Sequence, residues 1–234
     1  MSMRFSRFIS ILLVGFVGYY VLSHNAQVTR NVMVSASGSV RVVPDSVLIN
    51  ATISSVAADN ATSLSSANKS ADLMRVALKT NKIEDKYLKT QSLSVTPEYK
   101  YSNSGSQLVG YRATQNFEIT VRDANNSGQI VDAITKAVGN SLTINSLSSF
   151  VYDPIAAQED ARAIAIKNAK AKAENYAKLS GAKLGKVQFI TEEPMQSQPV
   201  PMAVGSAKVM TDSTKVDLGE QSITVNLTVT WFLR

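Results

Sequence analysis

The feature that most constrains this chain is an alanine at every fourth position from residue 157 to residue 177. The members of the series are Ala157, Ala161, Ala165, Ala169, Ala173 and Ala177. Residues four apart form a ridge on a helix, and methyl side chains let a neighbouring backbone approach closely. Asp153 and Pro154 suit the start of such a helix, and Gly181 suits its end. The series therefore predicts one long helix whose role is packing.

The two ends of the ridge are expected to face different neighbours. At about 100° per residue, the middle of the ridge, 165–173, lies on the same side of the helix as Ile155 and Tyr176, so this side should face a sheet. Ala157 and Ala161 rotate away from it toward a second surface. That surface is either another helix of the same chain or a neighbouring subunit, which makes these two alanines candidate interface residues.

The rest of the chain alternates between strand and helix patterns. Apolar residues at every second position predict strands, and apolar residues at helical spacing predict helices. Strands are expected near 32–42, 47–53, 93–101, 109–121, 142–152, 186–190 and 223–231, and helices near 60–81, 123–139 and 153–181. This order is typical of an α+β fold, a two-layer sandwich with three helices packed on antiparallel or mixed sheets. Two similar strand–helix–strand passages suggest two subdomains, about 31–122 and 123–234.

The N-terminal segment is predicted to direct export. Arg4 and Arg7 precede a strongly apolar run at 8–22, which predicts a hydrophobic helix. Residues 1–26 are therefore either a signal peptide or a membrane anchor, and 27–234 form the exported domain. Whether the segment is cleaved stays open, so the protein is either anchored in the inner membrane or released into the periplasm.

Composition removes most kinds of enzyme and metal site from consideration. The chain has no cysteine and a single histidine, His24, and its net charge of +6 is not concentrated as in a nucleic-acid-binding face. Ser66 and Lys69 form an S-x-x-K match without the companion motifs of that chemistry. Adjacent acids occur at Glu84–Asp85, Glu159–Asp160 and Glu192–Glu193, where we expect solvated side chains. We therefore predict no catalytic residues, no metal, no cofactor and no nucleic-acid partner.

Four motifs occur in a fixed order along the chain. They are the opening strand "VSASGSVRVVPDSV", the hairpin "LKTQSLSVTPEYKYSNSGSQLVGYRATQ", the alanine–lysine helix followed by "LSGAKLGKV", and the final strand "VNLTVTW". Together they resemble the SIMPL-domain family of bacterial periplasmic immunogenic and oxidative-stress defence proteins. Ala36 stands where the family usually has its first glycine. The resemblance covers the chain from about residue 31 to its end. It implies a two-layer α+β fold, an envelope location, a loose link to stress tolerance, no established catalytic residues, and ring-like oligomers in some members.

These observations favour a non-enzymatic envelope protein that acts by self-association, with residues 8–22 in the membrane if they are not removed. The alternative is a module that binds a ligand or an envelope polymer through Tyr99, Tyr101 and Tyr111. The strand alternation places all three tyrosines on the apolar side, which predicts that they help to build the core. An exposed tyrosine cluster would instead favour the binding module. An enzyme using Ser66 and Lys69, or paired acids, is the third hypothesis.

Overall fold

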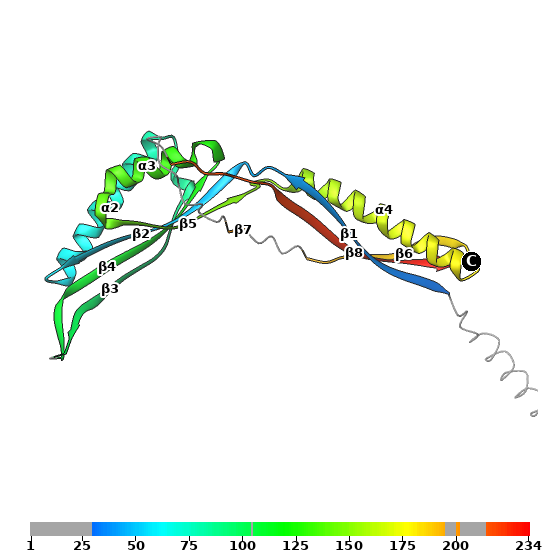
Figure 1. The fold of residues 1–234 in the computed structure, drawn as a ribbon, viewed down its shortest axis with the longest axis horizontal. Coiled ribbons are helices and arrows are strands. Elements are labelled where there is room, and N and C mark those ends of the chain that lie inside the picture. The colour runs from blue at the N-terminus through cyan, green and yellow to red at the C-terminus, as the bar shows by residue number, and fades with distance from the viewer. Residues whose placement is uncertain (1–29, 104, 195–199, 202–213) are drawn as a thin grey trace, which may run out of the picture. The chain divides into compact units, whose positions relative to one another are not determined.

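The structure is a computed structural model that describes residues 30–103, 105–194, 200–201 and 214–234 (Figure 1). The expected N-terminal hydrophobic helix at 8–22 lies outside these residues. The described helices are α2 (Asn60–Thr80), α3 (Ser127–Val138) and α4 (Ile155–Leu179), with 3-10 turns at Asp85–Tyr87, Ala124–Asn126 and Gly139–Ser141. The strands are β1 (Asn31–Val42), β2 (Ser46–Ala57), β3 (Leu88–Ser102), β4 (Gly105–Val121), β5 (Leu142–Phe150), β6 (Leu184–Glu192), β7 (Val200–Pro201) and β8 (Gln221–Leu233). The expected α+β class is confirmed, and the strands form a three-stranded sheet in the order β1-β8-β6 and a five-stranded sheet in the order β3-β4-β2-β5-β7.

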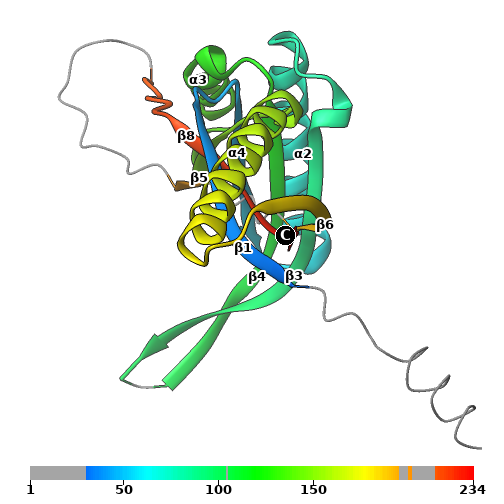
Figure 2. The same cartoon turned by 90° about the vertical axis from the view of Figure 1, so that its right-hand side faces the viewer.

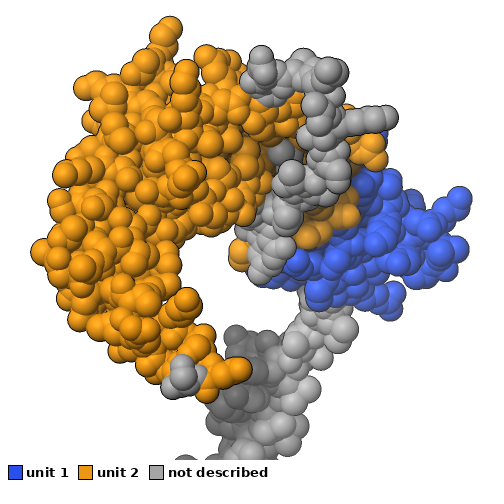
Figure 3. Space-filling view, turned by 60° about the vertical axis from the view of Figure 1, so that its left-hand side comes forward, with its two compact units in different colours: residues 1–36, 166–193, 227–234 blue, residues 37–165, 194–226 orange. Residues whose placement is uncertain are grey.

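The chain divides into two compact units, each assembled from segments that are distant in the sequence (Figure 3). Among the described residues, unit 1 contains 30–36, 166–193 and 227–234, and unit 2 contains 37–103, 105–165, 194, 200–201 and 214–226. These units do not follow the halves 31–122 and 123–234 suggested by the sequence. In both units, strand residues from the beginning of the chain pair with strand residues from its end.

Helices α2 and α3 cover one face of the five-stranded sheet in unit 2. Odd-numbered residues of β2 and β4 point toward the helices, because successive strand residues alternate between faces. The largest fully buried side chains include Ile49, Ile53, Phe117, Ile119, Met74 and Ile134. Helix α2 begins where the Asp59 carboxylate accepts the backbone N–H of Thr62 at 2.9 Å. The apolar residues at helical spacing and those at strand spacing thus pack together in a single core.

Helix α4 is buried only along its alanine ridge. Residues 161, 165, 169, 173 and 177 are each 0–2 % exposed. Ile155 and Tyr176 are 60 % and 48 % exposed, so the expectation that they share the buried side is wrong. On the solvent side, Lys170 and Glu174 form an ion pair with 3.8 Å between Nζ and Oε1. Methyl groups four residues apart are therefore almost the entire packing surface of this 25-residue helix.

The expectation that Ala161 turns toward a second surface is also wrong. Ala161 is 0 % exposed and lies against β1 of its own chain, where a Cβ on Gly38 would be 2.0 Å from the Ala161 carbonyl oxygen. An i, i+4 row is inclined to the helix axis, so it drifts around a straight helix. Because β-strands twist, a strand can follow such an inclined ridge over several turns. Ala157 is half-buried at the start of the same row.

Candidate functional site

The hairpin of β3 and β4 extends past the end of its neighbouring strand. β2 pairs with β4 as far as Ala57, which lies opposite Tyr111, whereas β3 and β4 stay paired to Ser102 and Gly105. Residues 98–103 and 105–110 therefore form a two-stranded extension without a third strand, which we name the hairpin arm (Figure 2). The arm carries Tyr99 and Tyr101, two of the three tyrosines that the sequence suggests as ligand contacts.

The base of the hairpin arm is fixed by a β-bulge and an ion pair. The register of β3 shifts between Glu98 and Tyr99, and Gly110 opposite has a φ of 149°. A Cβ on Gly110 would be 2.4 Å from the Ala57 carbonyl oxygen, so only glycine fits this close approach. The Arg112 guanidinium donates two hydrogen bonds of 2.8 and 2.7 Å to the Glu98 carboxylate. The bulge and the ion pair together set the direction in which the arm leaves the sheet.

The ion pair at the base is charged at neutral pH. The hydrogen bonds from Arg112 hold the pKa of Glu98 below its ordinary value, and the same bonds raise the pKa of Arg112. Because the pKa of Glu98 is depressed in the folded protein, the pair contributes stability above the ordinary carboxyl pKa. That contribution is lost as the pH falls through the lowered pKa.

The apolar side chains of the hairpin arm are exposed. Tyr99 is 46 % exposed, Tyr101 79 %, Leu108 46 % and Val109 47 %. The rings of Tyr99 and Tyr101 lie side by side with their centroids 6.5 Å apart. The expectation that these two tyrosines build the core is therefore wrong, because β2 and the helices do not reach the rows on which they lie. Tyr111, at the last row that β2 covers, is half-buried and apart from this pair.

The arm also has an open strand edge. β3 is 15 residues long and lies at the edge of its sheet, a position that suits Pro97 because proline has no backbone N–H to donate. Edge strands present N–H and C=O groups that can pair with another chain. Clustered exposed apolar side chains on a soluble domain mark interaction sites. The hairpin arm combines both properties and is the candidate functional site.

Comparison with known proteins places this sequence in a family. The family model for SIMPL, described as a protein of unknown function, matches residues 32–231. This chain belongs to the SIMPL family. It is 27 % identical to the 26 kDa periplasmic immunogenic protein of Brucella melitensis, over 97 % of this chain and 95 % of that protein. It is 30 % identical to the uncharacterized protein YggE of Escherichia coli K12, over 86 % of this chain and 80 % of that protein.

The residues considered for catalysis are not brought together in this SIMPL chain. Ser66 and Lys69 lie three residues apart on α2, and Lys69 is exposed, so the two side chains do not share the buried cleft that S-x-x-K chemistry requires. The three acidic pairs are exposed as well, at Glu84–Asp85, Glu159–Asp160 and Glu192–Glu193. Within the described residues, no group of three or more histidines, cysteines or acids could hold a metal ion. None of the described helices is long and apolar enough to cross a membrane.

A hollow of about 550 Å³ lies on the face of the five-stranded sheet that α2 and α3 leave uncovered. Its lining includes Leu48, Glu118 and Tyr152. The Glu118 carboxylate accepts a hydrogen bond of 2.7 Å from Gln91, and the Arg122 guanidinium lies 3.3 Å from the Tyr152 ring centroid. The hollow thus contains one carboxylate, whereas acid–base catalysis of the glycosidase kind uses two.

Sequence reasoning singled out Tyr99 and Tyr101 but missed their setting. The signal that could have found it is the difference in strand length, since β4 has 17 residues and β2 has 12. A strand that is longer than its neighbour must extend beyond the sheet or bend away from it. Alternation alone shows which residues of a strand lie on the same face of the sheet. It does not show whether another element covers that face.

Proposed function

We propose that this SIMPL-family chain is a non-enzymatic protein of the bacterial cell envelope that faces the periplasm and works by self-association into a larger assembly such as a ring. The periplasmic location is supported by the name of the Brucella relative and by the apolar segment at 8–22 behind two arginines. The setting in stress tolerance comes from the family resemblance alone. No cofactor, metal or nucleic acid takes part in this proposal.

The observation that carries the proposal is the hairpin arm. Its four apolar side chains, Tyr99, Tyr101, Leu108 and Val109, are held away from the core of their own protomer by a bulge that only glycine fits. Burying them against a partner removes apolar surface from water, which contributes a favourable free energy of about 25 cal/mol per Å² buried. A second copy of this chain offers the same apolar residues and the same open β3 edge, so two arms can pair as antiparallel strands.

The absolute mass of the full chain tests the proposal. We expect light scattering on a sizing column in detergent to give a defined multiple of the 25.2 kDa protomer, unchanged on moderate dilution. A mass equal to one protomer at every concentration would contradict the proposal.

The exposed tyrosine pair also supports a second candidate function, which is the binding of a ligand or envelope polymer at the hairpin. Two tyrosine rings 6.5 Å apart, on an arm without other cover, form a surface on which flat apolar groups can stack. A monomeric full chain would favour this function, and ligand screening with Tyr101→Ser as the matched negative would then follow.

A further inference from the structure

Unit 1 carries an excess of basic side chains. The described residues of unit 1 contain three acids, Glu174, Glu192 and Glu193, against a larger number of lysines and arginines. Glu174 pairs with Lys170, and the other two acids lie at the last residue of β6 and directly after it. The described residues of unit 2 are close to balance between acids and bases. The positive charge of the folded chain is therefore concentrated in unit 1.

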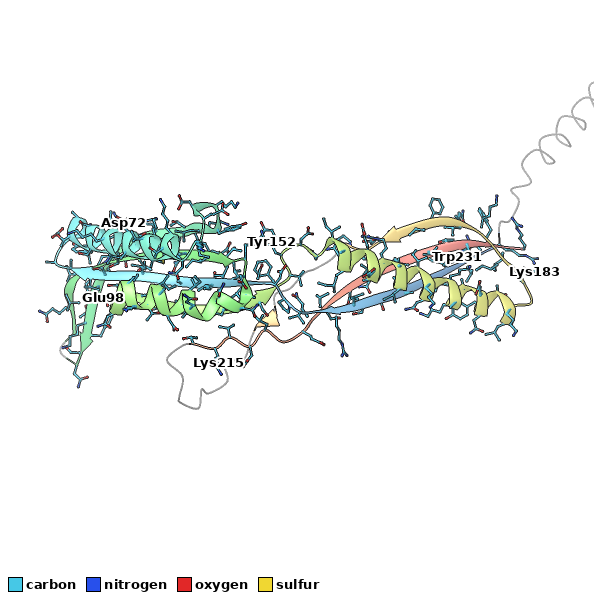
Figure 4. The ribbon with its side chains drawn as sticks, turned by 90° about the horizontal axis from the view of Figure 1, so that it is seen from above. Asp72, Glu98, Tyr152, Lys183, Lys215 and Trp231 are labelled. Atoms are coloured by element: carbon cyan, nitrogen blue, oxygen red, sulfur yellow. The ribbon has the colours of Figure 1, made fainter. Side chains whose placement is uncertain are left out.

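Backbone hydrogen bonds bring four of these basic residues to one end of unit 1. The Leu233 N–H donates to the Arg30 carbonyl at 2.8 Å, and Lys183 and Arg234 exchange two bonds of 2.7 and 2.9 Å. The Lys178 carbonyl accepts from Gly181 in the turn that leads to Lys183. The start of β1, the end of β8 and the turn between α4 and β6 thus meet here, as Figure 2 shows end-on and Figure 4 shows from above.

We name Arg30, Lys178, Leu179, Lys183 and Arg234 the basic end. All five side chains are exposed, and Leu179 is 76 % exposed at the last position of α4. No ion pair in the described part of the chain involves any of the four basic groups. Four cations beside a protruding leucine are the combination that amphipathic surfaces present to anionic membranes.

Further apolar side chains lie on the uncovered face of the same sheet. Phe189 of β6 pairs in register with Thr230 of β8 and is 65 % exposed. Met33 of β1 is 67 % exposed, whereas the next residue, Val34, is buried. Met33 therefore points to the uncovered face of the sheet, together with Ser35, whose hydroxyl is hydrogen-bonded to that of Thr228. Exposed aliphatic and aromatic groups next to cations are typical of a surface that enters the headgroup region of a bilayer.

The chain also limits how far the basic end can lie from a membrane. Eight residues lead from Leu22, the last residue of the apolar run, to Arg30. A fully extended chain covers at most about 3.6 Å per residue, which places Arg30 within roughly 29 Å of the end of that run. Where the apolar segment stays in the membrane, the basic end is therefore held near the lipid surface.

We infer that the basic end binds the anionic headgroups of the membrane, with its lysines and arginines on lipid phosphates and Leu179 in the interfacial layer. Each basic residue near an anionic membrane surface strengthens attraction by about fivefold. This inference depends on the envelope location and is independent of self-association, because the hairpin arm belongs to unit 2 and the basic end to unit 1.

The absence of cysteine allows a test on the full chain with one label. We would reconstitute Leu179→Cys, carrying a spin label, into vesicles of phosphatidylcholine with or without phosphatidylglycerol. Accessibility of the label to oxygen, which concentrates in lipid, would be compared with accessibility to a water-soluble nickel chelate. Val76→Cys, on the exposed side of α2 at 64 % exposure, is the matched control.

The expected result is a label at 179 that is shielded from nickel and accessible to oxygen only when phosphatidylglycerol is present, and that is released by high salt. The control label should remain accessible to nickel throughout. Adding Lys178→Gln and Lys183→Gln should lower the ratio of bound to free basic end roughly 25-fold, and both side chains are exposed, so folding should be retained.

Two results would overturn the inference. One is a label at 179 that stays accessible to nickel in both lipid compositions. The other is a label that is shielded equally in detergent and in both kinds of vesicle, which would show that this end contacts another protein copy.

Discussion

Gly38→Ala is expected to destabilise the protein by about 3 kcal/mol, which corresponds to a fall in the melting midpoint of roughly 6–12 °C for a chain of this size. A Cβ at this position would be 2.0 Å from the Ala161 carbonyl oxygen and 2.4 Å from the Ala165 backbone nitrogen. Both atoms are backbone, so neither can move without shifting α4 away from β1. Thermal unfolding followed by circular dichroism measures the effect.

Ser39→Ala is the matched control for Gly38→Ala. Ser39 is the next residue of β1 and points to the uncovered face, where its hydroxyl bonds that of Ser222 at 2.6 Å. The same hydroxyl accepts a hydrogen bond of 3.2 Å from the Thr224 hydroxyl. Losing these two exposed hydrogen bonds should change the free energy of unfolding by about 1 kcal/mol. If Gly38→Ala melted no lower than Ser39→Ala, the close approach of strand and helix would be contradicted.

Phe117→Ala is expected to cost about 3–5 kcal/mol, because it leaves a ring-sized cavity in the core of unit 2. Phe117 is 1 % exposed on the helix-facing side of β4, and the Arg75 guanidinium lies 5.8 Å from its ring centroid. The matched control is Phe189→Ala, the same substitution at a side chain that is 65 % exposed, with an expected change within about 0.5 kcal/mol. Chemical denaturation of both variants would compare them, and equal losses would contradict the described core.

Much of the fold follows from local sequence signals. The Asp153 carboxylate accepts the Ile155 N–H at 3.1 Å, and α4 begins at Ile155, close to the start that Asp153 and Pro154 predicted. Gly139 ends α3 with a φ of 66°, a conformation that glycine adopts readily. Such caps, and the alternation of residues along β2 and β4, depend only on neighbours within a few positions. They could therefore be predicted without knowing the topology.

The features that sequence reasoning missed depend on distant partners. Whether Tyr99 and Tyr101 are covered is decided by where β2 stops, at Ala57, far away in the sequence. Whether Ala161 is buried depends on the backbone of Gly38. The basic end joins segments from the beginning, the middle and the end of the chain. Tyr99, Tyr101 and Ala161 can be singled out from the sequence, but the residues that lie next to them in the fold cannot be inferred from spacing.

The central claim, assembly through the hairpin arm, is tested most directly by the mass of a full-length arm variant in detergent. Tyr101→Ser combined with Leu108→Ser removes two exposed apolar groups from the arm, and Val76→Ser removes one exposed apolar group from α2. Because neither arm residue packs in the core, both variants should melt like the unmodified protein. We expect the arm variant to fall to a single protomer or a smaller species while Val76→Ser keeps the mass of the unmodified assembly. An arm variant that retained the full assembly mass would contradict the account.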